Sequence, residues 1–311
     1  TYLGNSSRNT SMLINSHYIQ SDLKVLTGLV ESHFIAGVSG GRKAVCPGLL
    51  GEASTYVFHG ADFLSDPRAM DLVLEGNPCH EESLEIAEAA GVDFIVNVTL
   101  DHELQVSGVF AGDLRIAHEA AAKQAAKQVR FPCYEPYDVA ITHGGFVGIN
   151  HYQAAKAACV ASRVIKPGGC VILACDNTDT HPVGSVSYRT LIQLLKLIGA
   201  EAFLKVIKSD EWTFIPEQWQ VQMWARLFAV IPQKHFYYYS PQFRREDYEA
   251  CPGEYIVYEG KELAALDVSS FVDQALEDVS KKLGKSVADL KVCYLKDGPY
   301  AIPACQIEQK L

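Results

Sequence analysis

The 311-residue sequence lacks the long apolar run that a membrane-spanning segment requires. No stretch of about 18 or more apolar residues occurs, and no signal peptide is recognisable, so nothing in these residues indicates secretion or membrane insertion. The sequence also lacks a Cys-x-x-Cys pair, and its nine cysteines are odd in number and scattered. Because this usage is typical of a reducing cytosol, where thiols behave as small buried hydrophobes, we expect a cytoplasmic protein.

An excess of positive charge is missing too. The formal net charge is -10 at pH 7 and the sequence pI is about 5.5, which argues against nucleic acid and against an anionic membrane surface as partners. Small anionic substrates stay open, because a local cationic pocket can lie within an acidic protein. With 48% hydrophobic residues and a mean hydropathy of +0.02, the chain is predicted to be soluble and globular, and it is long enough for two domains.

Two common phosphate-binding signatures are absent. A P-loop needs Gly-Lys-Ser/Thr, but Arg42 separates Gly41 from Lys43, and Ala44 stands where the magnesium-binding hydroxyl belongs. A dinucleotide loop needs Gly-x-Gly-x-x-Gly after a strand, and no such run is found here.

What the sequence does contain is an irregular segment, residues 33–48, with one histidine, four glycines and adjacent basic residues. Glycines let backbone N–H groups approach a ligand, and successive N–H groups form an anion-binding concavity. Arg42 and Lys43 add fixed positive charge. The segment therefore predicts a pocket for a phosphorylated ligand beside His33, with a glycine-rich turn carrying a solvated Arg-Lys pair as the alternative.

Residues 33–48 resemble the signature of the lactate racemase family, nickel-pincer enzymes that invert the carbinol carbon of 2-hydroxy acids. The shared pattern is His-x-x-Ala-Gly-x-Ser-Gly-Gly-x-Lys, then Pro-Gly and a later histidine, here His59. The resemblance implies that Lys43 carries the covalent link to a thiolated pyridinium mononucleotide and that His59 is the protein ligand of nickel. It implies that His33 is one of two acid/base histidines. The other loop residues implied to bind this cofactor are Ser39, Gly40, Gly41 and Arg42.

A second group of polar residues opens a predicted helix at residues 150–165. Gln153 and Lys156 are three apart, so they share a helix face and could hold one carboxylate, with an amphipathic first turn as the alternative. The segment resembles the family's Tyr-Gln-x-x-Lys, which implies that Tyr152, Gln153 and Lys156 bind substrate and that Lys156 takes part in catalysis. Trp219 lies near the place of a pocket tryptophan in the family, and a core position is the alternative.

The expected fold is α/β, with two Rossmann-like domains and mostly parallel sheets. Strands are predicted at residues 23–30, 92–100 and 106–110, and helices at residues 66–75 and 114–128. Two prolines at residues 130–136 mark a domain boundary. Beyond it, the strand–helix–strand pattern of residues 137–174 predicts a parallel sheet, and the aromatic run 235–239 predicts a buried strand.

Three regions follow from this reading. Residues 1–130 are expected to form a partial cofactor-binding domain, and residues 131–260 a second α/β domain on the substrate side. By the resemblance, the C-terminal helix and strand of residues 261–311 return to the first domain.

The resemblance also predicts what the chain does. We expect a racemase or epimerase of a small 2-hydroxy acid, acting by reversible hydride transfer on the nickel-pincer nucleotide. Residues 1–32 contain no match to the family's substrate-binding arginine and second acid/base histidine, so the chain is expected to lack the family's N-terminal portion and to bind cofactor better than it turns over substrate. A non-catalytic binding homologue and an NAD-dependent dehydrogenase are the alternatives, and the oligomeric state, a homo-oligomer included, is left open.

Overall fold

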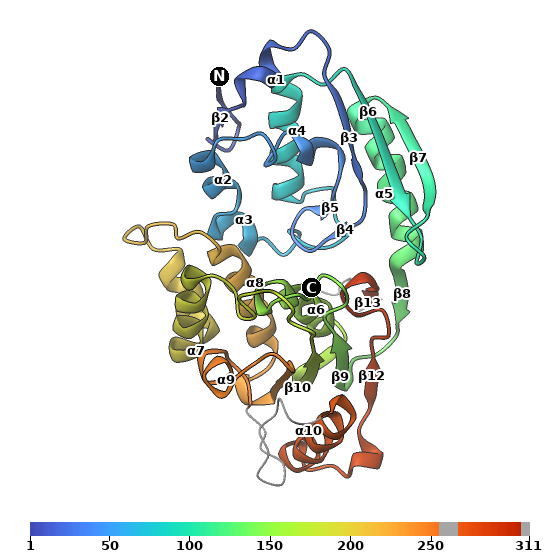
Figure 1. Ribbon diagram of the computed structural model, residues 1–311, viewed down its shortest axis with the longest axis vertical. Coiled ribbons are helices and arrows are strands. Elements are labelled where there is room, and N and C mark those ends of the chain that lie inside the picture. Colours follow the sequence, from blue (N-terminus) through green and yellow to red (C-terminus); the bar gives the residue numbers. More distant parts are fainter. Residues whose placement is uncertain (255–266, 306–311) are drawn as a thin grey trace. The chain divides into compact units, whose positions relative to one another are not determined.

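The computed structural model describes residues 1–254 and 267–305, and it divides the chain into two compact units, Thr1–Arg130 and Phe131–Leu311 (Figure 1). Each unit combines helices with a sheet, so the predicted α/β class is confirmed. Within the two described ranges, no helix is long and apolar enough to span a bilayer.

The first unit contains a three-stranded sheet with the order β3-β6-β7. β3 runs parallel to β6, and β6 pairs with β7 in the antiparallel sense. The elements of this unit are β1 (Tyr2–Asn5), β2 (Ser11–Leu13), α1 (Ser16–Gln20), β3 (Val25–Leu29), β4 (Ser32–His33), β5 (Gly37–Val38), η1 (Gly41–Ala44), α2 (Glu52–Phe58), α3 (Ala61–Ser65), α4 (Pro78–Ala90), β6 (Phe94–Leu100), β7 (Val106–Gly112) and α5 (Leu114–Val129).

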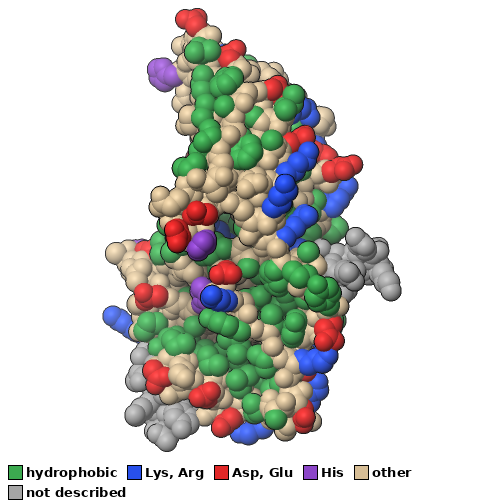
Figure 2. Space-filling view, turned by 90° about the vertical axis from the view of Figure 1, so that its right-hand side faces the viewer, with side chains coloured by type: hydrophobic (Ala, Val, Ile, Leu, Met, Phe, Trp, Pro, Cys, Tyr) green, Lys and Arg blue, Asp and Glu red, His purple; other side chains and the backbone are tan. Residues whose placement is uncertain are grey.

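The two faces of this sheet have different surroundings. On β6, Ile95 and Asn97 are buried, because every second side chain points toward the interior, where α5 supplies Ala121 and its neighbours. The alternate position Phe94 is 42% exposed, and Val109 on β7 is 64% exposed. Hydrophobic side chains are accordingly visible on the surface of this unit in Figure 2. The predicted strands 92–100 and 106–110 are thus confirmed.

The helix predicted at residues 66–75 is wrong, because this segment consists of turns. Leu72 has a φ of +61°, and its N–H donates to the carbonyl of Gly37 at 2.8 Å. Leu72 and Leu74 pack against the core cluster that contains Val30 and Val38. The apolar residues that favoured a helix therefore cover the glycine-rich loop as irregular chain.

The second unit contains a parallel four-stranded sheet with the order β11-β10-β9-β12, as the strand–helix–strand pattern predicted. All four residues of β11 are buried, which confirms the aromatic run as a core strand. The elements are β8 (Arg130–Cys133), β9 (Tyr137–His143), α6 (His151–Ser162), β10 (Ile165–Ala174), α7 (Val186–Ile207), α8 (Gln218–Val230), η2 (Gln233–His235), β11 (Phe236–Tyr239), α9 (Arg245–Ala250), α10 (Val268–Leu283), η4 (Val287–Asp289), β12 (Val292–Tyr294), η5 (Gly298–Tyr300) and β13 (Ile302–Cys305).

The described part of the C-terminal segment supplies a strand to the sheet of the second unit, and its expected packing on the first domain stays a prediction. Its described residues, from 267 to 305, belong to the second unit. β12 adds a fourth strand beside β9, and the Tyr300 hydroxyl accepts the backbone N–H of Val147 at 3.1 Å. The segment packs here because β12 satisfies backbone groups along the edge of β9. Residues 261–266 and 306–311 of the predicted third region lie outside the described residues.

Candidate functional site

The loop of residues 33–48 in the first unit contains three glycines with positive φ, and the adjacent pair Gly40 and Gly41 shapes its tip against the sheet. Gly40 and Gly41 have φ values of +73° and +51°, in the region that favours glycine. A Cβ on Gly41 would lie 2.5 Å from a ring carbon of His118, and the Gly41 N–H donates to the Asn97 side-chain oxygen at 2.8 Å. The loop is therefore held against β6 and α5 at a distance that only glycine permits.

Arg42 lies beneath this loop. Its side chain is 0% exposed, and its guanidinium donates to the carbonyls of Ala36 at 2.7 Å and Val38 at 2.8 Å. It also lies 2.9 Å from the His118 ring. Burial lowers the pKa of Arg42 to about 9, so the group stays charged at pH 7. In this structure the loop carbonyls take the hydrogen bonds of Arg42, and its contact with a cofactor stays a prediction.

Ser39 is also engaged with the protein itself. Its hydroxyl donates to the carbonyl of Leu29 at 2.8 Å and accepts the backbone N–H of Glu31 at 3.0 Å. The Ser39 hydroxyl and the Gly41 N–H thus both make hydrogen bonds within the protein that stabilise the loop. Their contacts with a cofactor stay a prediction.

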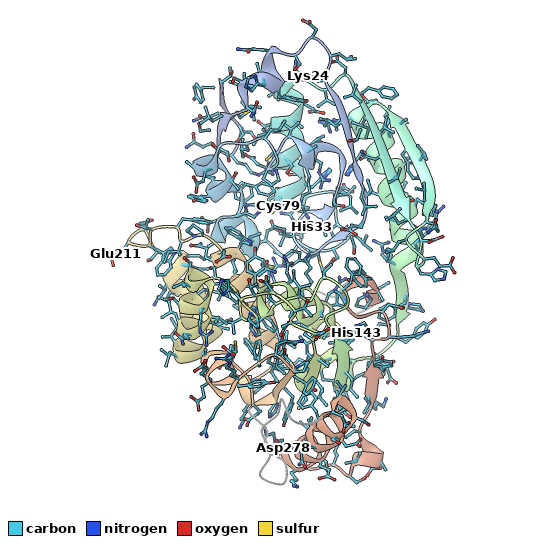
Figure 3. The ribbon with its side chains drawn as sticks, viewed as in Figure 1. Lys24, His33, Cys79, His143, Glu211 and Asp278 are labelled. Atoms are coloured by element: carbon cyan, nitrogen blue, oxygen red, sulfur yellow. The ribbon has the colours of Figure 1, made fainter. Side chains whose placement is uncertain are left out.

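The loop brings two predicted site residues together at its surface. His33 ends β4, and its Nε2 lies 2.7 Å from the Nζ of Lys43 on η1. The other ring nitrogen, Nδ1, accepts the backbone N–H groups of Ile35 at 3.4 Å and Ala36 at 3.3 Å. Figure 3 labels His33 at this strand. The Lys43 amine and the His33 imidazole are therefore within hydrogen-bond distance of each other.

His59 follows the last turn of α2. Its Nδ1 lies 3.0 Å from the carbonyl of Thr55 and donates to it, since a carbonyl only accepts. Burial lowers the pKa of His59 to about 4, and the positive charge of Lys43 contributes to this shift. The ring is therefore neutral at pH 7, with its lone pair on Nε2, which is the form of histidine that ligates metals.

In the second unit, α6 and α8 bring Tyr152 and Trp219 together. The indole N–H of Trp219 donates to the Tyr152 hydroxyl at 2.7 Å, and the Trp219 ring stacks on Phe214 at 6.0 Å between ring centres. Burial raises the pKa of Tyr152 to about 12. Both side chains are partly exposed, so Trp219 is held in place without being fully enclosed in the core.

Gln153 and Lys156 lie on the same helix. Asn150 caps α6 by accepting the backbone N–H of Gln153 at 2.8 Å, and it is tied to Asp179 by a second hydrogen bond of 2.8 Å. The cap fixes where the helix begins. Gln153 and Lys156 are consequently one turn apart on a partly exposed face, with Tyr152 beside them.

Two family models match the chain. The lactate racemase N-terminal domain matches residues 1–71, which contain His33, Lys43 and His59. The lactate racemase C-terminal domain matches residues 134–235, which contain Tyr152, Gln153, Lys156 and Trp219. The chain belongs to the lactate racemase family.

Curated members of the family are similar over most of this chain. It is 33% identical over 220 residues to a lactate racemase of Lactiplantibacillus plantarum, an alignment that covers 70% of this chain and 51% of that protein. It is 30% identical over 238 residues to a lactate racemase of Thermoanaerobacterium thermosaccharolyticum, covering 74% of this chain and 55% of that protein. The chain thus spans about half the length of these curated relatives.

Solved structures support the fold. The lactate racemase apoprotein from Thermoanaerobacterium thermosaccharolyticum matches with a TM-score of 0.81 and 24% identity, over 97% of this chain and 67% of that chain. A protein from Thermotoga maritima matches with a TM-score of 0.60 and 15% identity, over 94% and 69%. At these identities the likeness concerns the fold.

Two residues that support the loop of this family member were not predicted as part of it. Asn97 is 0% exposed inside a strand of branched apolar residues, and His118 is 2% exposed on an alanine-rich helix. A polar residue in the middle of an apolar strand was the available signal for Asn97, because a buried amide requires a hydrogen-bond partner. The hydrogen-bond partners of His118 lie 76 and 79 positions away, so the residues next to it in the sequence do not indicate them.

Proposed function

We propose that the chain acts as a racemase or epimerase on a small 2-hydroxy acid, with a nickel-pincer nucleotide attached to Lys43. The observation that carries this proposal is the 2.7 Å contact between Lys43 Nζ and His33 Nε2. It places a group suited to covalent attachment beside a group suited to proton transfer. The family membership of the chain supports the same reaction class.

The residues of the first unit fit such a cofactor. The Lys43 amine supplies an attachment point, and the neutral ring of His59 supplies a nitrogen ligand whose orientation is fixed by Thr55. Among the described residues, no group of three or more His, Cys, Asp or Glu side chains is placed to hold a metal ion. Nickel bound through His59 would therefore take its other donors from the nucleotide. When bound, this group supplies the site that accepts a hydride and returns it.

In the proposed reaction, His33 exchanges the proton of the substrate hydroxyl at Nε2. When the hydroxyl loses this proton and the carbinol carbon loses a hydride, the substrate becomes a planar keto acid. Return of the proton and the hydride then restores either configuration. Because the reaction starts and ends with the same oxidation state, it needs no external oxidant.

The second unit is proposed to bind the carboxylate of the substrate. Lys156 offers an ammonium group and Gln153 an amide N–H, and the two lie one turn apart on α6. Trp219 holds the Tyr152 hydroxyl by a 2.7 Å hydrogen bond, which orients that phenol. In this proposal Lys156 also stabilises the developing charge on the substrate, as a catalytic group.

We further propose that this chain binds the cofactor more completely than it turns over substrate. Inversion in both directions calls for a second acid/base group. In the first unit, His80 and His118 are buried, with pKa values lowered by burial to about 3 and about 4. His17 and His102 are exposed. Neither pair is suited to a second proton transfer beside His33.

The test is racemisation of L-lactate and a panel of other 2-hydroxy acids by the chain produced together with cofactor-synthesis enzymes, followed by chiral chromatography. We expect slow conversion that is lost in Lys43→Ala, a raised KM in Lys156→Met, and no change in Lys205→Met, an exposed lysine of α7. Saturable NAD binding with no nickel would instead support a dehydrogenase. Cofactor bound with no turnover on the whole panel would support a non-catalytic homologue.

A further inference from the structure

Tyr152 is held at both of its polar ends by two consecutive residues of α8. The indole N–H of Trp219 donates to its hydroxyl at 2.7 Å, and the side-chain amide of Gln220 donates to its backbone carbonyl, also at 2.7 Å. The ring of Tyr188 on α7 meets the Tyr152 ring edge-on, at 5.3 Å between ring centres. The phenol and the backbone of Tyr152 are therefore both tied to neighbouring helices.

The contact made by Gln220 is more than backbone satisfaction. Gln220 is 2% exposed and lies on a helix whose residues Val221 and Trp224 are core. A buried amide costs free energy that an apolar side chain of similar size would avoid. The carbonyl of Tyr152 lies in a helix, where the N–H four residues later already serves as its donor. What the additional hydrogen bond supplies is a fixed placement of this turn relative to α8.

The turn held in this way is the one that carries the proposed carboxylate-binding residues. Gln153 directly follows Tyr152 on α6, and Lys156 lies one turn later. On the other side of Tyr152, its backbone N–H donates to the carbonyl of Val183 at 3.3 Å. The backbone of Tyr152 is thus fixed at its N–H by the segment after β10 and at its carbonyl by Gln220.

The hydroxyl of Tyr152 is left with a directed proton. An indole N–H only donates, so the phenol oxygen accepts from Trp219 and its own proton points elsewhere. The Tyr152 side chain is half-buried, so solvent and small solutes reach part of it. A carboxylate oxygen is a strong acceptor for such a proton. The arrangement therefore suits a phenol that donates to a bound carboxylate while Trp219 supports it from behind.

We propose that Gln220 is a positioning residue for substrate binding, which together with Trp219 forms a two-point clamp on Tyr152 and fixes its hydroxyl for the substrate carboxylate. The inference rests on the proposed function, which assigns the carboxylate to this turn of α6. It gives Gln220 an effect on the affinity for 2-hydroxy acids that is exerted through Tyr152.

The indole N–H of Trp219 reports on the clamp in the unloaded chain. The protein has three tryptophans, and Trp219→Phe identifies the signal among the indole signals of ¹⁵N-labelled protein. In Gln220→Met, which fills a similar space without a donor, we expect this N–H to exchange with solvent about threefold to tenfold faster, as loss of one hydrogen bond implies. The indole N–H of Trp212, which donates to Gln218 at 2.9 Å, should not change. An unchanged exchange rate at Trp219 would overturn the proposal.

Gln233 provides a matched control for substrate affinity. It also donates from its side-chain amide to helix carbonyls, those of Leu195 and Lys196 on α7, at 3.3 and 3.2 Å. In titrations with L-lactate followed by backbone NMR signals, we expect the Kd to rise about threefold to tenfold in Gln220→Met and to stay unchanged in Gln233→Met. Because both variants lose an amide-to-helix contact, a general loss of stability would affect them alike. Equal Kd values in wild type and Gln220→Met, or an equal rise in both variants, would overturn the proposal.

The wild type alone provides a measurement that does not depend on a variant that might misfold. Since the Tyr152 hydroxyl accepts the Trp219 N–H and donates to the ligand, added L-lactate should shift the Trp219 indole signal. Backbone signals that shift with lactate while this indole signal stays unmoved would overturn the clamp. No shift of any signal would count against the proposed function, and the indole exchange rate in Gln220→Met would still decide the clamp.

Discussion

Replacement of Arg42 by methionine tests whether this residue supports the loop from below. Methionine has a similar length and fills much of the space, so the main loss is the set of hydrogen bonds. The carbonyls of Ala36 and Val38 lose donors at 2.7 and 2.8 Å, and His118 loses a contact at 2.9 Å. Breaking a buried charged network costs about 3–5 kcal/mol.

The lower end of that range is expected here, because burial of the charge already opposes the gain from its hydrogen bonds. A loss of about 3 kcal/mol corresponds to roughly 100-fold in an opening equilibrium. Hydrogen exchange followed by mass spectrometry measures this locally, so it does not require both units to unfold in one transition. We expect peptides from residues 33–48 to exchange roughly 100-fold faster in the unloaded Arg42→Met chain.

Lys127→Met is the matched control, since it removes an exposed cation from α5 and should stay within about 0.5 kcal/mol of the wild type. Exchange in Arg42→Met equal to that of the wild type, together with loss of cofactor binding, would refute the reasoning. Arg42 would then contact the ligand, as the sequence alone suggested.

Three further predictions concern titration and hydrogen bonding. Because the pKa of folded His118 is lowered to about 4, the unfolded chain binds more protons than the folded chain between about pH 6.5 and 4. The free energy of unfolding, measured by thermal unfolding, should therefore fall as the pH is lowered through this window, by about 2 kcal/mol at pH 5 for this residue. A free energy of unfolding that rises toward pH 5 would contradict the assignment. Because the pKa of His59 is about 4, nickel binding followed by isothermal calorimetry in the loaded chain should persist to about pH 5, and loss already near pH 6.5 would point to a different ligand. Tyr152→Phe removes the hydroxyl that accepts the indole N–H of Trp219, and it should lower the free energy of unfolding by about 1 kcal/mol in fluorescence-monitored urea unfolding. An unchanged urea midpoint would show that this hydrogen bond does not stabilise the fold.

The sequence predicted well those features that depend on neighbouring residues. The strands of the second unit followed from continuous apolar runs, and the helix that carries Gln153 and Lys156 followed from a run of alanines and branched apolar residues. The irregular loop followed from its glycines. In each case the cause lies within a few positions of the effect.

Arg42 shows why the rest of the site could not be predicted. From the sequence, an arginine next to Lys43 in a glycine-rich loop indicates charge directed at a ligand. Its actual direction depends on His118, which is 76 positions away, and on loop carbonyls that fold back over it. Contacts at that separation leave no local pattern.

Two other features also depend on contacts between residues far apart in the sequence. Residues 66–75 have the composition of a helix, yet Leu72 and Leu74 are needed to cover the core cluster at Val30 and Val38, and tertiary packing decided the backbone. The C-terminal strand β12 pairs with β9, because β9 has an edge that can accept another strand. The local sequence of β12 does not indicate this partner.

The most direct test of the central claim is intact-mass analysis with nickel quantitation on the 311-residue chain produced together with cofactor-synthesis enzymes. The account predicts a covalent mass increment with bound nickel in the wild type, no increment in Lys43→Ala, and an increment without nickel in His59→Ala. A wild-type increment that persists in Lys43→Ala, or nickel that is retained in full by His59→Ala, would contradict it.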